Sequence, residues 1–127
     1  DKITEEMDAD LFIGQMKEDA KRALDAGIKK ERIILDPGVG FAKTQEQNLM
    51  TIANLDRLKA LGYPVLLGTS RKSVIGYVLD VPTDKRLVGT LATSAVAVQT
   101  GCMFVRVHDV KENVELIQML ERIRESR

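Results

Sequence analysis

Hydrophobic residues along this chain follow two alternating spacings. Three short runs in which they are consecutive, at about residues 33–36, 64–68 and 102–107, predict β-strands that are covered on both faces. Each run stops at polar residues, which predicts that each strand ends in a loop. Longer segments with a hydrophobic residue every three or four positions separate the runs, and these predict amphipathic helices.

Five helices are predicted from this spacing. The first begins near Glu5, where Thr4 can cap it, and ends at Gly27, which can adopt the left-handed conformation of a helix terminus. Gly62 and Gly101 follow two of the later helices. In chain order, the predicted helices span about residues 5–26, 49–61, 74–78, 87–98 and 110–123.

Repeated strand and helix units of similar length predict a parallel sheet, because parallel neighbours need a crossover connection. Asp36, Ser70 and Arg106 stand at the ends of the three strands, at nearly equal intervals. The fold class is therefore α/β, as part of either a doubly wound sheet or a (β/α)8 TIM barrel. A complete barrel needs about 250 residues, so 127 residues would form only part of one. Both folds bind ligands beyond the carboxyl ends of their strands.

Composition excludes several classes of function. Nineteen Lys and Arg balance nineteen Asp and Glu, so the chain has no net charge to hold nucleic acid. No apolar run approaches the roughly 18–20 residues that span a bilayer, and the amino terminus lacks the features of a signal or transit peptide. We therefore expect a cytoplasmic protein without membrane contact. With one histidine, and with Cys102 as its one cysteine and predicted to be buried, the chain cannot build a protein-ligated zinc site.

The loop after the first strand carries a carboxylate and two glycines. Asp36-Pro37-Gly38 opens this loop, and Gly40, Phe41 and Lys43 follow. Asp, Pro and Gly each favour turns, so an ordinary surface turn is one interpretation. A ligand site is the other, because glycines permit close approach of a flat or anionic ligand.

The second strand ends in two cations and two hydroxyl groups. Ser70-Arg71-Lys72-Ser73 follows Gly68 at the start of a predicted helix, where the helix dipole favours anions. Ser70 as a helix cap, with Arg71 and Lys72 in solvent, is the structural alternative. Cations in a first helical turn oppose the dipole, which favours an anionic ligand.

The third strand ends in Arg106 and His108, which project to one side of the sheet while Val107 points away. The structural alternative for Arg106 is an ion pair with Asp36 or Asp109. For His108 it is a histidine of the core whose hydrogen bonds are satisfied there. Combined with the other two strand ends, these residues indicate a site for an anion and a heterocycle.

Three motifs in this order resemble the dihydropteroate synthase family of pterin-binding TIM barrels. They are Asp-Pro-Gly-x-Gly-Phe-x-Lys from Asp36, Ser-Arg-Lys-Ser from Ser70 and Arg-Val-His-Asp from Arg106. The resemblance covers essentially all of residues 1–127 and implies a single partial barrel domain. Asp36, Ser70 and Arg106 would then end strands six, seven and eight, which makes the chain the C-terminal half of the barrel.

The resemblance also implies a role for each motif residue. The aspartate matching Asp36 hydrogen-bonds the pterin, and the lysine matching Lys72 contacts the ring and frames the p-aminobenzoate pocket. The arginine matching Arg106 stacks on the pterin and, with the histidine matching His108, faces the pyrophosphate. These four are the predicted catalytic residues, and none is a predicted metal ligand. The predicted substrate-binding residues are Asp36, Gly40, Phe41, Gly68, Ser70, Lys72, Arg106 and His108.

The family's reaction is a transferase step of folate biosynthesis and a target of sulfonamides. It condenses 6-hydroxymethyl-7,8-dihydropterin pyrophosphate with p-aminobenzoate to give 7,8-dihydropteroate and pyrophosphate. Asp36 would stabilise a cationic pterin, while Arg106, His108 and Mg²⁺ would stabilise the departing charge. We expect Mg²⁺ to be bound mainly through the pyrophosphate and the missing N-terminal half.

Nothing in the chain matches the first strands of the family, so we expect the chain by itself to be inactive. Half a barrel leaves sheet edges and an apolar face uncovered, which predicts a homodimer or association with the missing half. Two alternatives stay open. One is a non-catalytic barrel half that docks onto another. The other is a methyltetrahydrofolate methyltransferase domain, which shares a carboxylate-lined pterin site without the Ser-Arg-Lys-Ser loop.

Overall fold

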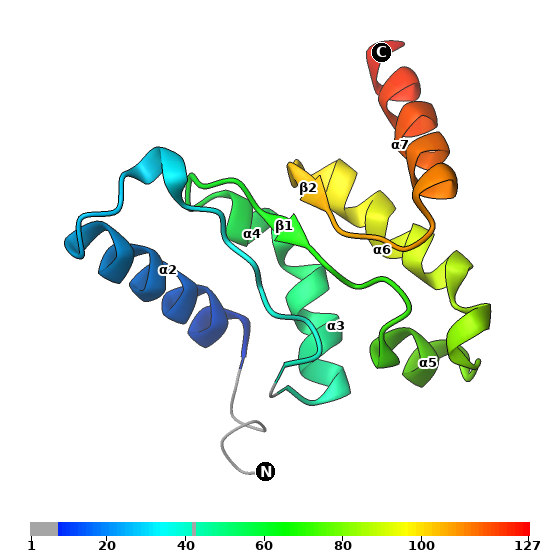
Figure 1. Cartoon of the computed structure of the whole chain (residues 1–127), viewed down its shortest axis with the longest axis horizontal. Coiled ribbons are helices and arrows are strands. Elements are labelled where there is room, and N and C mark those ends of the chain that lie inside the picture. Colours follow the sequence, from blue (N-terminus) through cyan, green and yellow to red (C-terminus); the bar gives the residue numbers. More distant parts are fainter. Residues whose placement is uncertain (1–7, 42) are drawn as a thin grey trace.

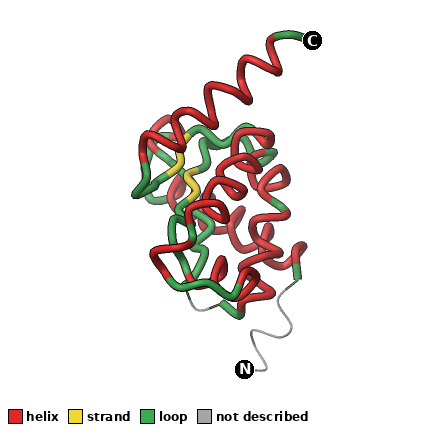
Figure 2. The backbone as a smooth tube through the Cα atoms, turned by 90° about the vertical axis from the view of Figure 1, so that its right-hand side faces the viewer, coloured by secondary structure: helices red, strands yellow, loops and turns green. Residues whose placement is uncertain are grey.

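A layer of helices lies against one side of a narrow parallel sheet in the computed structural model, which describes residues 8–41 and 43–127 (Figure 1). A view rotated by 90° shows the strands beside the stacked helices, and the C-terminal helix extends beyond both (Figure 2). The helices are α2 (Ala9–Asp25), α3 (Gln45–Ala53), α4 (Leu55–Lys59), α5 (Ser73–Leu79), α6 (Leu87–Thr100) and α7 (Val110–Glu125), with 3-10 turns η1 (Lys30–Arg32) and η2 (Thr83–Lys85).

The sheet is parallel, as predicted, but its strands are short. Strand β1 (Leu66–Leu67) pairs with β2 (Phe104–Val105). The predicted strand at 33–36 is reduced to one bridge between Leu35 and Val65, in which Leu35 N donates to the Pro64 carbonyl at 2.8 Å. A second hydrogen bond, from Leu66 N to the Leu35 carbonyl at 2.9 Å, closes the bridge, and the described residues show no further pairing of this segment.

The expectation that the strands are covered on both faces is wrong for the described part of the chain. Leu35 is 5% exposed, whereas the neighbouring Ile34 is 51% exposed. In β2, Phe104 is 43% exposed, whereas its neighbour Val105 is partly buried. Side chains alternate across a strand, so this pattern shows that helices cover one face of the sheet and leave the other open.

Helix boundaries differ from the predictions at two places. The helix predicted over 49–61 divides into α3 and α4 at Asn54, whose side-chain amide donates to the Met50 carbonyl at 2.8 Å. Helix α2 begins at Ala9, where Asp8 accepts a hydrogen bond from Leu11 N at 2.8 Å. The predicted start at Glu5 and the cap at Thr4 lie outside the described residues.

The remaining helices are confirmed close to their predicted bounds. Helix α6 ends at Gly101, whose φ of 85° lies in the left-handed region that favours glycine. Helix α7 contacts α6 through a buried hydrogen bond of 2.6 Å between Ser94 and Asn113. Within residues 8–41 and 43–127, no helix is long and apolar enough to cross a membrane.

The core lies between the strands and the inner faces of α4 and α6. Leu55 and Leu58 of α4, Val65 beside β1 and Ala97 of α6 are 0% exposed, and Leu67 of β1 is 1% exposed. Burial of each large aliphatic side chain stabilises the fold by about 1.5–3 kcal/mol. This packing holds the strands in place, and with them the loops that follow the strands.

Replacement of a core leucine tests this account of the packing. We expect Leu58→Ala to lower the free energy of unfolding by about 2–5 kcal/mol, because it removes buried methyl groups and leaves a cavity. Urea unfolding followed by circular dichroism measures the change. The control is Leu11→Ala on α2, which is 45% exposed in the wild type and should cost less than about 1 kcal/mol. Equal losses in the two variants would contradict the proposed core.

Candidate active site

The loops that follow the three strand segments surround a cleft of about 540 Å³. Of the predicted site residues, Gly40 alone does not line this cleft, although a side chain at Gly40 would lie 3.6 Å from Cδ of Lys72. Val107, which we predicted to point away, lines the cleft as well. The lining residues are Asp36, Phe41, Gly68, Ser70, Lys72, Arg106, Val107 and His108.

The first loop is held by hydrogen bonds that the motif alone does not reveal. Asp36 Oδ1 accepts from Gly38 N at 2.8 Å, which closes the expected turn. Lys43 Nζ donates to the carbonyls of Pro37 and Gly38 at 2.8 and 3.0 Å. At the far end of the loop, Gly40 N donates to an asparagine side chain of α3. The turn and the site are therefore compatible, because the turn places the Asp36 carboxylate at the cleft.

Lys72 connects the second loop to the first. Its Nζ atom donates to the Val39 carbonyl at 2.7 Å and lies 5.1 Å from the centre of the Phe41 ring, within the range of a cation–π interaction. Desolvation lowers the pKa of Lys72, the Asp36 carboxylate opposes this shift, and Arg106 adds to it. Desolvation lowers the pKa of Lys43 as well, with the same opposition from Asp36. The cleft therefore brings several cations near one carboxylate.

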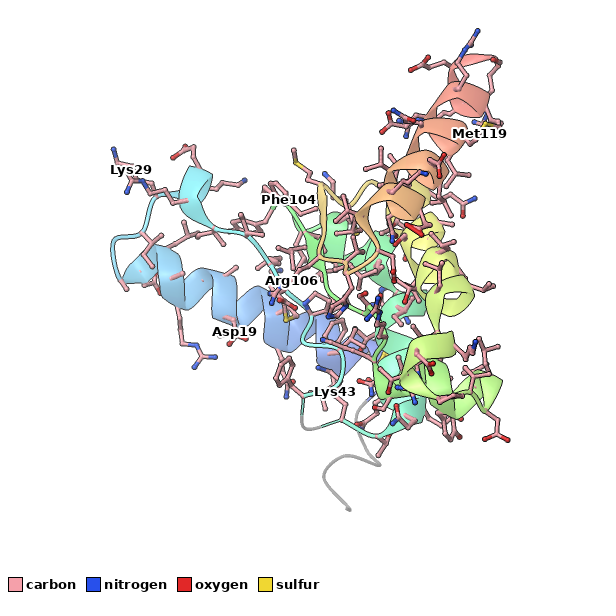
Figure 3. All side chains as sticks on the ribbon, turned by 45° about the vertical axis from the view of Figure 1, so that its right-hand side comes forward. Asp19, Lys29, Lys43, Phe104, Arg106 and Met119 are labelled. Carbon is pink, nitrogen blue, oxygen red and sulfur yellow. The ribbon has the colours of Figure 1, made fainter. Side chains whose placement is uncertain are left out.

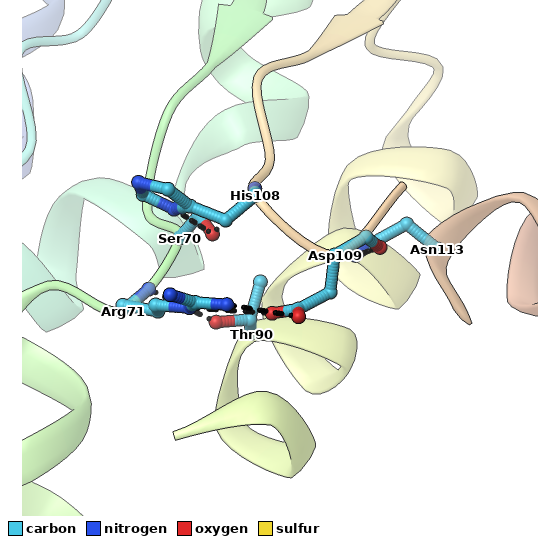
Figure 4. A network of polar contacts seen from close by, with 6 residues as sticks. All are labelled: Ser70, Arg71, Thr90, His108, Asp109 and Asn113. Carbon is cyan, nitrogen blue, oxygen red and sulfur yellow. Dashed lines mark hydrogen bonds and ion pairs between the residues drawn. The ribbon is translucent and has the colours of Figure 1, made fainter. Parts of the chain in front are cut away.

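Ser70 binds His108 rather than capping a helix, so the structural alternative for Ser70 is wrong. Helix α5 begins at Ser73, with Lys72 at its cap position. The Ser70 hydroxyl lies 2.8 Å from His108 Nδ1 and accepts a hydrogen bond from His108 N at 3.0 Å (Figure 4). Ser70 is 8% exposed, so these two contacts join the second and third loops in a mostly water-excluded place.

Arg71 pairs with Asp109, which settles the alternatives for Arg106. Arg71 Nη2 lies 3.0 Å from Asp109 Oδ1, and Arg106 forms no salt bridge within residues 8–41 and 43–127. The structural alternative, in which Arg106 pairs with Asp36 or Asp109, is therefore wrong. The charge of Arg106 is available to a ligand. Figure 3 shows Arg106 between Phe104 and Lys43 in that view.

The Arg71 backbone is held in the left-handed region, with φ of 57°. Its N–H donates to Thr90 Oγ1 at 3.1 Å, and its carbonyl accepts from Arg86 Nη1 at 3.0 Å. Asp109 is fixed in turn by Asn113, whose side-chain amide donates to the Asp109 carbonyl at 2.8 Å. The site is thus supported by Thr90 of α6, by Arg86, which directly precedes α6, and by Asn113 of α7. Sequence reasoning missed all three: Thr90 and Arg86 lie 19 and 15 positions from Arg71, and the apolar pattern of α7 does not reveal the bond that Asn113 makes to the preceding turn.

The described residues do not form a metal site. They contain no group of three or more His, Cys, Asp or Glu side chains that could hold a metal ion. Asp109 is already paired with Arg71. Cys102 is half-buried rather than fully buried, and burial raises the pKa of its thiol, which makes it a weak nucleophile near neutral pH.

Comparison with known proteins shows the family to which this chain belongs. The sequence pattern of the pterin-binding enzymes matches residues 3–108. The chain is 53% identical over 113 residues to the dihydropteroate synthase of Clostridium beijerinckii, which covers 88% of this chain and 42% of that protein. This chain therefore belongs to the family of pterin-binding enzymes. Within the family it is homologous to dihydropteroate synthases, which are transferases.

Solved structures of dihydropteroate synthases share the fold. The enzyme from Coxiella burnetii in complex with pteroic acid aligns with a TM-score of 0.85 at 36% identity, over 96% of this chain and 47% of that one. The Yersinia pestis enzyme with a sulfonamide drug aligns with a TM-score of 0.83 at 38% identity, over 91% of this chain and 42% of that one. The chain spans about two fifths of the length of the relatives that it matches, and its architecture is an α/β fragment of their TIM barrel.

The charges around Lys72 give a prediction with a definite sign. We expect Asp36→Asn to lower the pKa of Lys72 further, because it removes the one charge that opposes desolvation. Arg106→Gln should raise the pKa of Lys72, because it removes a neighbouring positive charge. Titration of the ¹³Cε resonance of Lys72 measures both shifts. The control Asp84→Asn, in η2, should leave the resonance unchanged, and shifts of the same sign in the two site variants would contradict the geometry.

Proposed function

We propose that this chain supplies the C-terminal strands of a dihydropteroate synthase barrel and, with them, the pterin and pyrophosphate side of its active site. The observation that carries the proposal is the convergence of Asp36, Lys72, Arg106 and His108 on one cleft. The three motifs that bear these residues occur in the order expected for the last three strands. The order of the motifs supports this placement in the barrel.

Asp36 and Lys72 are suited to bind the pterin ring. A flat heterocycle with amide and amino groups needs an acceptor and a donor at its edge. Asp36 Oδ1 is used in the turn, and no hydrogen bond to Oδ2 occurs within the described residues, so Oδ2 is available as the acceptor. Lys72 provides the donor. The charge of Asp36 also stabilises positive charge that develops on the pterin when its bond to the pyrophosphate breaks.

Arg106 and His108 are suited to receive the pyrophosphate. In the proposed reaction the bond between the pterin methylene carbon and the pyrophosphate oxygen breaks, and its electron pair leaves with the oxygen. The aniline nitrogen of p-aminobenzoate then forms the new carbon–nitrogen bond and loses a proton. The planar guanidinium of Arg106, which forms no ion pair with the residues that the structure describes, matches the departing phosphate oxygens in charge and shape.

The p-aminobenzoate ring would lie beside Phe41, which is 70% exposed and presents an aromatic face near Lys72. Gly40, Gly68 and Ser70 complete the predicted substrate contacts. Pteroic acid joins a pterin to p-aminobenzoate, and its complex with the Coxiella burnetii relative supports a site with room for both parts. The sulfonamide complex of the Yersinia pestis relative supports the same assignment.

Mg²⁺ does not fit the described residues as a protein-ligated ion, because they hold no cluster of three suitable ligands. In our proposal the ion is bound by oxygens of the pyrophosphate and by groups other than these residues. We therefore assign no step of the reaction to it.

The uncovered face of the sheet is suited to contact further barrel strands in the cytoplasmic enzyme. Ile34, Met103 and Phe104 are exposed on or beside the strands. Apolar side chains in such a position favour burial against another part of the barrel. A second exposed apolar group lies on α7, at Met119 and Ile123 one helical turn apart, and supports the predicted association of two copies.

Removal of the Lys72 amine tests the proposed reaction. The assay needs a chimaera in which this chain replaces the corresponding part of the Clostridium beijerinckii enzyme. We expect Lys72→Ala to lower the turnover of dihydropterin pyrophosphate by about 100-fold or more, because one preorganised donor contributes on that order. Lys111→Ala, at an exposed position of α7, is the matched control and should leave turnover unchanged. Full activity of the Lys72 variant would disprove the assigned role.

Loss of the Arg106 guanidinium should weaken binding of the same substrate. A hydrogen bond to a charged group contributes about 1.5–3 kcal/mol, so we expect Arg106→Ala to raise the dissociation constant of dihydropterin pyrophosphate by about 10- to 100-fold. Calorimetric titration of the chimaera measures it, with Arg124→Ala on exposed α7 as the control. Equal affinities in the wild type and the Arg106 variant would exclude the guanidinium from the binding site.

A further inference from the structure

The contact between Ser70 and His108 constrains the position of a proton. Ser70 Oγ lies 2.8 Å from His108 Nδ1 and also accepts a hydrogen bond from the backbone N–H of His108 at 3.0 Å. A serine hydroxyl has one hydrogen to donate and two lone pairs to accept with. Because the backbone N–H occupies one lone pair, the contact with Nδ1 must use either the hydroxyl hydrogen or the second lone pair.

The two possibilities differ in whether the hydroxyl hydrogen of Ser70 has an acceptor. If Nδ1 carried the proton and donated to Ser70, the hydroxyl hydrogen would have no acceptor within residues 8–41 and 43–127, at a side chain that is 8% exposed. If Ser70 donates to Nδ1, its hydroxyl hydrogen and the backbone N–H of His108 are both bonded, and the remaining ring hydrogen on Nε2 belongs to a side chain that lines the open cleft. A buried donor without an acceptor costs stability, so the second arrangement is favoured. The neutral ring then carries its proton on Nε2.

We propose that Ser70 is a positioning residue that holds His108 in the Nε2–H tautomer, so that the ring presents a donor, rather than an acceptor, to an anion in the cleft. His108 lines the cleft beside Arg106 and Lys72, and an Nε2–H adds a third donor to this side. The proposal rests on the proposed function for the identity of the anion alone. The tautomer itself follows from the hydrogen bonds.

Supporting contacts keep the two loops at the distance that this bond requires. The ion pair between Arg71 and Asp109 joins the residues that directly follow Ser70 and His108 (Figure 4). The Asp109 carbonyl is held by Asn113, which is 1% exposed and is itself bonded to Ser94. The two loops are therefore clamped at adjacent positions, and Ser70 meets the histidine ring in a defined orientation.

The chain contains one histidine, so its imidazole can be observed without overlap. We would record the long-range ¹H–¹⁵N spectrum of the ¹⁵N-labelled chain without ligand, in alkaline solution where an ordinary imidazole is neutral. The expected result is a single Nε2–H tautomer, with Nδ1 shifted as a hydrogen-bond acceptor. A single Nδ1–H tautomer, or an exchanging mixture such as a solvated imidazole shows, would overturn the proposal.

Three variants separate positioning from general loss of structure. Ser70→Ala should convert the single tautomer to an exchanging mixture and remove the acceptor shift at Nδ1. Ser70→Thr retains the hydroxyl and should restore the wild-type pattern. Ser126→Ala makes the same substitution near the end of α7, where the hydroxyl contacts Arg122, and should change nothing at the imidazole. An unchanged imidazole spectrum in Ser70→Ala would overturn the proposal, even if that variant were less stable.

Inorganic pyrophosphate, added to the same samples, separates this inference from the proposed function. We expect it to shift the Nε2–H signal of the wild type and to bind several-fold more weakly to Ser70→Ala. A fixed Nε2–H tautomer that ignores pyrophosphate would support the role of Ser70 and count against the proposed function of His108. A response to pyrophosphate without a fixed tautomer would support the function and overturn the role of Ser70.

Discussion

Parallel backbone pairing is the constraint on which the rest of the structure depends. The bridge at Leu35 and the register of β1 with β2 align three chain segments, and the core leucines of α4 hold them from one side. Parallel strands end at a common edge, so Asp36, Lys72 and Arg106 meet although they are far apart in sequence. Few hydrogen bonds make up this pairing, which is why side-chain contacts between the loops add so much to the order of the site.

Electrostatics in the cleft follows from that convergence. Lys43, Lys72 and Arg106 surround Asp36, and burial of the two lysines makes their charged forms less stable than in water. A ligand with several negative charges relieves this repulsion when it binds. The same arrangement would repel a cationic ligand. The proposed preference for an anion is consistent with this arrangement, and Lys43 and Lys72 also fix the first loop by donating to its carbonyls.

Much of the fold and most of the site residues could be predicted from the sequence. Periodic apolar residues predicted the order of helices and strands, and all of the predicted site residues except Gly40 line one cleft. The break at Asn54 was missed, because a single amide bonded to a carbonyl one turn away leaves no trace in the apolar pattern. The exposure of Ile34 and Phe104 was missed, because a continuous apolar run does not show which face is covered. The Arg71 partner depends on long-range packing and could not be chosen in advance.

Arg71 shows that one position can serve two requirements that conflict. A non-glycine residue in the left-handed region carries strain of about 1–2 kcal/mol, and glycine would remove it. Glycine, however, has no guanidinium to pair with Asp109. The position therefore cannot be optimised for local backbone energy and for loop clamping at once. Selection for greater thermal stability would have to act elsewhere in the molecule, and this strained arginine marks where stability has been exchanged for an ordered site.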